Sequence, residues 1–127
     1  MSSRRDHRMM SLLGANLNDK TTKGLENIFK RVLKDGMHGI GFSPYEEGQE
    51  PGDQISEAQI RRRMKIIKPY TKWIRTFSCT DGNELIPKIA REYGIKTLVG
   101  AWLGDDAEIN KREITGLIKL AKKGADI

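Results

Sequence analysis

The chain has 127 residues, of which 37% are hydrophobic and 31% charged, and its formal net charge is +6. This length fits one domain, and the composition, although polar, suffices for three amphipathic helices and three strands. A single cysteine excludes an internal disulfide and a structural zinc site of several thiolates, and no run approaches the roughly 20 apolar residues of a membrane helix.

The positive charge is spread along the whole chain. Its densest run, Arg61-Arg62-Arg63 with Lys65 and Lys68, falls on a predicted helix that also carries an apolar stripe. Proteins that bind single-stranded nucleic acid interleave basic residues with aromatic ones for base stacking, and this run has no such aromatics. We therefore interpret it as a solvated helix face. Nucleic-acid binding is a weaker alternative, which salt-dependent retention on DNA would reveal.

The first part of the chain is polar, and we expect a flexible lead-in over residues 1–22. Its longest apolar run, residues 9–13, is too short for a secretory signal, which favours a cytoplasmic protein. A helix is predicted from Thr22 to Asp35, where Gly36 can supply the left-handed cap. Its apolar residues follow the helical spacing of one face: Leu25, Ile28, Phe29, Val32 and Leu33.

The first strand is predicted over residues 37–45, where Ser43-Pro44 breaks the ladder. A polar loop follows over residues 46–54. It is longer than the usual connection between a strand and a helix, which suggests a functional loop. The next helix has a full start signal, with Ser56 as cap, Gln59 as its capping-box partner, and Pro69 as its stop.

Two further strand-helix units follow. Residues 73–79 alternate like a strand, and the helix after them carries Pro87 in its first turn, where proline is tolerated. Residues 95–103 form a nearly continuous apolar run, which is typical of a strand covered on both faces. The last helix has a predicted apolar face of Ile109, Ile114, Leu117, Ile118 and Ala121, and residues 125–127 resemble the opening of another strand.

The predicted strands begin about 23 to 35 residues apart, with a helix between each pair. This spacing indicates right-handed βαβ units and a parallel sheet, hence an α/β fold. A doubly wound sheet and a TIM barrel are both compatible with the pattern alone. In both architectures ligands bind at the carboxyl ends of the strands, which here are residues 42–45, 77–81 and 102–106.

None of these strand ends carries the glycine-rich turn of a dinucleotide or phosphate site, so we expect no nucleotide cofactor. Aromatic and polar side chains occur there instead. Sugars stack their C–H faces on aromatic rings and direct their hydroxyls to carboxylate and guanidinium groups. The predicted sugar-binding residues are Phe42, Tyr45, Arg75, Phe77, Asp81 and Trp102. The alternative is that Phe77 and Trp102 belong to the core.

A glycosidase would need two carboxylates flanking the scissile bond. By position the candidates are Asp81, Asp105 and Asp106. Each also has an ordinary explanation as a helix cap or as a first-turn acid favoured by the helix dipole. No pair has a catalytic signature, and the sequence predicts no catalytic residue and no metal site in this chain.

Three segments together resemble bacterial members of the family 17 glycoside hydrolases, which are TIM barrels of the endo-1,3-β-glucanase type. They are GIGFSPY (residues 39–45), WIRTFS (73–78) and LVGAWL (98–103), in the family's order and spacing. The resemblance covers residues 23–127. At position 77 the family more often has tyrosine, so Phe77 lacks a hydroxyl that could contact the sugar.

The resemblance implies that residues 23–127 form the first part of a TIM (β/α)8 barrel, incomplete in this chain. It implies a retaining hydrolase of β-1,3-linked glucans whose two catalytic glutamates belong to the fourth and seventh strands, beyond the C-terminus of this chain. The six sugar-binding residues would then contribute part of the substrate surface.

The alternative, from another class, is a non-catalytic carbohydrate-binding or oligomeric α/β module. Three strand-helix units leave open sheet edges, through which the chain could self-associate. Neither reading requires a membrane or nucleic acid.

Overall fold

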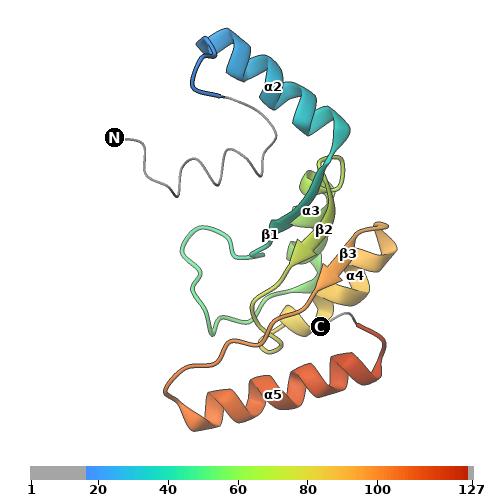
Figure 1. Cartoon of the computed structure of the whole chain (residues 1–127). Helices are drawn as coiled ribbons and strands as arrows, with labels where there is room; N and C mark the ends of the chain where they lie inside the picture. The colour runs from blue at the N-terminus through green and yellow to red at the C-terminus, as the bar shows by residue number, and fades with distance from the viewer. Residues whose placement is uncertain (1–16, 126–127) are drawn as a thin grey trace. The chain divides into compact units, whose positions relative to one another are not determined.

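The computed structural model describes residues 17–125 and divides the chain into two compact units, Met1–Lys34 and Asp35–Ile127 (Figure 1). The lead-in expected over residues 1–22 lies outside the described residues up to position 16. Helix α2 spans Thr22–Asp35, as the spacing predicts, and none of its residues is buried. None of the helices within residues 17–125 is long and apolar enough to cross a bilayer.

The second unit contains a parallel sheet of three strands, β1 (Met37–Gly41), β2 (Thr71–Arg75) and β3 (Lys96–Leu98), in the order β1-β2-β3. This confirms the predicted α/β class. Each strand is shorter than its sequence pattern suggests. Single hydrogen bonds continue the pairing beyond the ladder, since the N–H of Phe42 donates to the carbonyl of Arg75 at 2.8 Å.

Helix α3 (Glu57–Ile67) begins at the predicted cap, where the Ser56 hydroxyl accepts the N–H of Gln59 at 3.2 Å. The capping-box role expected of the Gln59 side chain is wrong. Its amide is buried and donates to the carbonyl of Pro44 at 2.8 Å, and it also pairs with Gln49. Gln59 therefore fixes the long loop after β1 onto the helix, because a buried amide needs partners wherever they lie.

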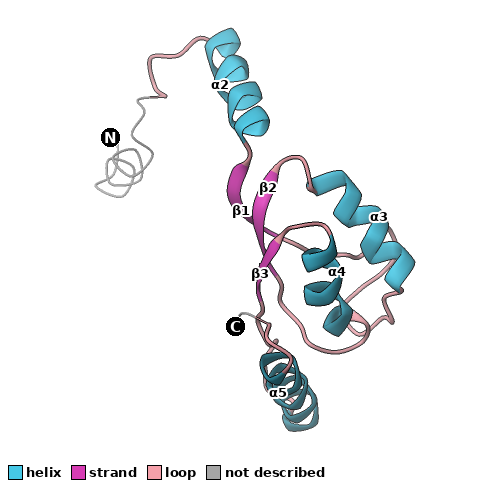
Figure 2. Cartoon of the chain, turned by 90° about the vertical axis from the view of Figure 1, so that its right-hand side faces the viewer, coloured by secondary structure: helices cyan, strands magenta, loops and turns pink. Residues whose placement is uncertain are grey.

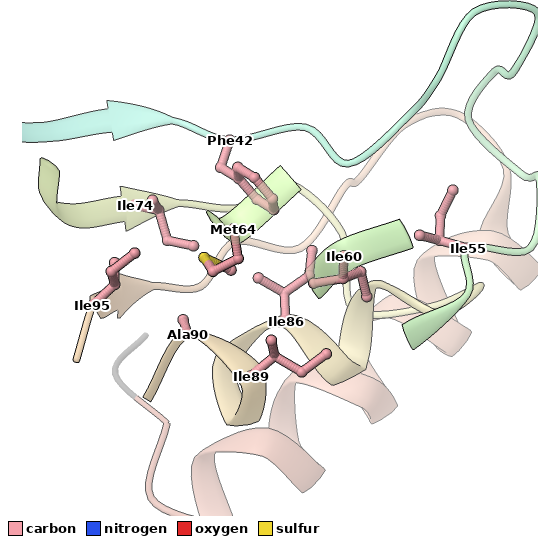
Figure 3. Close-up of a cluster of buried hydrophobic side chains, with 9 residues drawn as sticks. All are labelled: Phe42, Ile55, Ile60, Met64, Ile74, Ile86, Ile89, Ala90 and Ile95. Atoms are coloured by element: carbon pink, nitrogen blue, oxygen red, sulfur yellow. The ribbon is translucent and has the colours of Figure 1, made fainter. Parts of the chain in front are cut away.

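One face of the sheet is covered by α3 and by α4 (Ile86–Glu92), which follows the short 3-10 helix η1 (Asn83–Leu85) (Figure 2). Ile74 of β2 and Phe42, which directly follows β1, point into this layer (Figure 3). Each fully buried side chain of this size contributes roughly 1.5–3 kcal/mol. The core consists of Phe42, Ile55, Ile60, Met64, Ile74, Ile86, Ile89, Ala90 and Ile95.

Helix α5 (Ala107–Lys122) is capped by Asp106, whose carboxylate accepts the N–H groups of Glu108 and Ile109. Its predicted apolar face is confirmed only at Leu117, which packs against the buried Cys79, Val99 and Leu120. Three other members of that face are 44–49% exposed: Ile109, Ile114 and Ile118. The helix instead buries Glu113 and Leu120. A Cβ at Gly116 would lie 2.5 Å from the carbonyl oxygen of Cys79, so a glycine permits this close approach.

The other face of the sheet has no helix packed on it within residues 35–125. Trp73 is half-buried there, while Arg75, Phe77 and Leu98 are exposed. We call the surface formed by Trp73, Arg75, Phe77 and Leu98 the open face. The expectation that residues 95–103 are covered on both sides is therefore wrong within the second unit, where Trp102 is 62% exposed.

Candidate functional site

The loops that follow β2 and β3 are held together by one buried carboxylate, that of Glu113 on α5. Its side chain is 2% exposed. One oxygen accepts the hydroxyls of Ser78 and Thr80, both at 2.6 Å. The other accepts the backbone N–H of Cys79 at 2.8 Å and that of Trp102 at 3.2 Å.

This arrangement explains why a charged residue can be buried here. A carboxylate removed from water is costly unless its lone pairs are satisfied, and four donors satisfy them. The donors come from the ends of two neighbouring strands, so Glu113 fixes the relative position of the two loops. It also fixes the backbone of Trp102, whose side chain extends into solvent.

Arg75 and Phe77 lie together on the open face. The guanidinium carbon of Arg75 is 5.2 Å from the centre of the Phe77 ring, within the range of a cation–π contact. Phe77 is 38% exposed. Its ring occupies space left by Gly41, because a Cβ there would be 3.4 Å from the ring. Gly39 of β1 likewise lies against Trp73 of β2, whose Cβ would be 3.1 Å from a Cβ built on the glycine. The glycines of β1 therefore make room for Trp73 and Phe77.

The other predicted sugar-binding residues lie elsewhere. Phe42 is 5% exposed and belongs to the core, so its ring is not available to a ligand. The Tyr45 hydroxyl accepts the amide of Asn83 at 3.4 Å, and Tyr45 is half-buried beside the core. Asp81 forms an ion pair with Arg112 at 2.6 Å. Of the predicted residues, Arg75 and Phe77 contact each other on the open face. Phe42 lies in the core instead, and Asp81 pairs with α5.

Position 113 was not among the residues predicted from the sequence. A signal is present in hindsight, since Glu113 lies four residues after Ile109 and four before Leu117, in the middle of an apolar periodicity. The donors that bury it lie more than 30 residues earlier, except for Trp102. Helix periodicity contains no information about such partners.

Cys79 is buried beside the same carboxylate. Burial raises the pKa of its thiol from 9.0 to about 11, and the negative charges of Glu113 and Glu84 add to this shift. The native state therefore retains the thiol proton where the unfolded chain loses it. The stability that this provides is complete below pH 9 and is lost as the pH rises towards 11.

We expect Cys79 to resist iodoacetamide at pH 8 in the native chain and to react once the chain is unfolded in urea. We also expect the free energy of unfolding to fall more steeply between pH 9 and pH 11 in the wild type than in Cys79→Ala. Urea titrations of both proteins at these pH values would measure this difference. The lysines and tyrosines titrate in both proteins, so their effect cancels in the comparison. Equal slopes would contradict the assignment.

The described residues contain no group of three or more histidine, cysteine, aspartate or glutamate side chains that could hold a metal ion. No family model, no curated protein and no solved structure matches this chain.

Proposed function

We propose that this chain is the N-terminal part of a glycoside hydrolase acting on β-1,3-linked glucans, and that it supplies sugar-binding surface at the ends of its strands. The observation that carries the proposal is the exposed pair of Arg75 and Phe77 at the carboxyl end of β2. A ring beside a guanidinium group offers a sugar both a stacking surface and hydrogen-bond donors.

The arrangement of the second unit supports a barrel. Strands follow one another in chain order, and both crossover helices, α3 and α4, lie on one face of the sheet (Figure 2). A barrel is wound in this way, with helices outside and side chains inside, whereas a doubly wound sheet has helices on both faces. On this proposal the open face is the inner surface, which further strands would cover.

The proposal assigns no catalytic role to the carboxylates of this chain. The Glu113 carboxylate is buried and accepts four hydrogen bonds, so it is not available to a substrate. Asp81 is engaged with Arg112, and Asp106 caps α5. By the family resemblance, the acid and the nucleophile are glutamates of the fourth and seventh strands.

We expect laminarihexaose to bind weakly, with a dissociation constant on the order of 1 mM, because only part of a binding cleft is present. Phe77→Ala should weaken binding about 3- to 10-fold through loss of ring stacking. Tyr70→Ala is the matched control, since Tyr70 is 41% exposed and precedes the opposite end of the same strand. Isothermal titration calorimetry measures both.

Equal effects of Phe77→Ala and Tyr70→Ala would contradict a sugar site at the carboxyl end of β2. Maltohexaose, an α-1,4-linked glucan of the same length, serves as the control ligand. Binding of both oligosaccharides with the same affinity would contradict the assignment to β-1,3-linked glucans.

A second candidate function, a self-associating module, is favoured by one observation. β1 and β3 are both edge strands of the described sheet, and the open face exposes Phe77 and Leu98. Unpaired edges and exposed apolar faces promote association. Sedimentation velocity distinguishes the candidates: a stable dimer unaffected by laminarihexaose would favour the module.

A further inference from the structure

A groove lies between helices α4 and α5 and contains none of the residues of the open face. Its volume is about 830 Å³. Apolar or small surface of its lining comes from Leu85 of η1, Pro87 of α4, and Gly116 and Leu120 of α5. The two helices run in the same direction, since Asp81 before α4 pairs with Arg112 of α5, and Arg91 near the end of α4 donates to the carbonyl of Gly124 after α5.

The groove is lined by more cations than acids. Near the amino ends of the two helices, the acids Asp81, Glu84 and Glu108 lie among Lys111 and Arg112, and Arg112 pairs with Asp81. From there towards the carboxyl ends the charged lining consists of four cations, namely Lys88, Arg91, Lys119 and Lys123. The result is a recess with mixed charge at one end and positive charge at the other.

The four cations form no ion pair within residues 17–125. Glu84 and Glu92 each lie four residues from Lys88. The Glu92 carboxylate pairs with Arg61 of α3 at 2.6 Å, and the Glu84 carboxylate accepts the N–H of Gly82 at 2.9 Å. Lys119 and Lys123 are four residues apart on one helix, a spacing at which like charges repel. This end of the groove therefore holds an excess of positive charge that the described chain does not neutralise.

We propose that the groove between α4 and α5 binds an acidic peptide segment of a partner protein, with apolar side chains on its floor and carboxylates at its basic end. Charge complementarity identifies the occupant. A nucleic acid fits less well, because the lining contains no aromatic ring for base stacking.

The test uses the full chain and a fluorescein-labelled peptide of ten residues made of glutamate and leucine, followed by fluorescence anisotropy. We expect the double variant Lys119→Glu/Lys123→Glu to weaken binding by about tenfold or more, because two attractive charges become repulsive. Lys30→Glu/Lys34→Glu is the matched control. It reverses two exposed lysines with the same spacing on α2 and changes the net charge equally. Circular dichroism checks that both variants fold.

A peptide in which serine replaces leucine should bind several-fold more weakly, because it cannot use the apolar floor. Equal losses in the two double variants would overturn the proposal, since they would show attraction by net charge alone. Tighter binding of an oligothymidylate of the same charge, sensitive to Lys119→Glu/Lys123→Glu, would also overturn it and assign the groove to nucleic acid. Binding of the serine peptide as tightly as the leucine peptide would overturn the role of the apolar floor.

Discussion

Replacing Glu113 with alanine is expected to destabilise the second unit by about 3 kcal/mol or more. The substitution removes the acceptor of the Ser78 hydroxyl and of two backbone N–H groups, and it leaves the Thr80 hydroxyl only its longer contact with Asp81, at 3.1 Å. Buried donors without partners lose the hydration of the unfolded chain and gain nothing in return. Glu113→Gln should cost less, because its amide oxygen can still accept some of these hydrogen bonds.

Urea unfolding followed by tryptophan fluorescence measures the difference. Glu108→Gln is the control, because Glu108 lies on the same helix and is exposed. It loses only a dipole interaction in the first turn, worth at most about 1 kcal/mol. If Glu113→Ala were no more destabilising than Glu108→Gln, the carboxylate would not hold the two loops together.

Replacing Gly82 with alanine is expected to cost about 3–5 kcal/mol, for two reasons that add. Gly82 has a φ of +93°, which L-residues rarely adopt. A Cβ there would lie 2.1 Å from the carbonyl oxygen of Ile55. That neighbour is backbone, and its own N–H donates to the carbonyl of Asp81 at 2.8 Å, so it cannot move without breaking this contact.

Gly94→Ala separates the two reasons. Gly94 also has a positive φ, of +71°, but nothing lies within 4 Å of a Cβ built on it. It should therefore cost only the conformational term, about 1–2 kcal/mol. Thermal unfolding of the two variants beside the wild type gives the comparison. Equal destabilisation would show that the turn at Gly82 is not packed against the segment before α3.

The elements of the second unit could be predicted largely from local chemistry. Ser56 and Asp106 each accept backbone N–H groups in the first turn of the helix that follows, so they cap α3 and α5. Pro87 lies in the first turn of α4, where a backbone N–H has no partner within the helix. These signals act within four residues of the chain. A sequence therefore contains both partners of each interaction side by side.

The packing face of α5 could not be predicted in this way. Apolar spacing favours Ile114 and Ile118, yet the helix approaches the sheet through Glu113, Gly116 and Leu120. The face of α5 that packs is decided by the donors after β2 and β3 that bind Glu113, and by the close approach of Gly116 to the Cys79 carbonyl. Those partners are distant in sequence, so no periodicity reveals them.

The candidate site was predictable in part. The order of residues along β2 was enough to place Arg75 and Phe77 on one face, because side chains of a strand alternate. The sequence does not predict that Phe42 faces the core. Gly39 and Gly41, which precede it, have no side chains that would show which face of the strand is buried. Asp81 lies beyond the end of β2 at Arg75, in a turn where its backbone adopts a positive φ of 56°, so strand alternation does not place its side chain.

Mapping the binding of laminarihexaose by NMR tests the central claim most directly. In a titration of the isotope-labelled chain, we expect shifts of the Phe77 amide, the Arg75 side chain and the Trp102 indole N–H. The Tyr70 amide, before the opposite end of β2, should not shift. Shifts confined to the helical side of the sheet, or no shifts at ligand concentrations of about 10 mM, which is tenfold above the expected dissociation constant, would contradict a sugar-binding role for the open face.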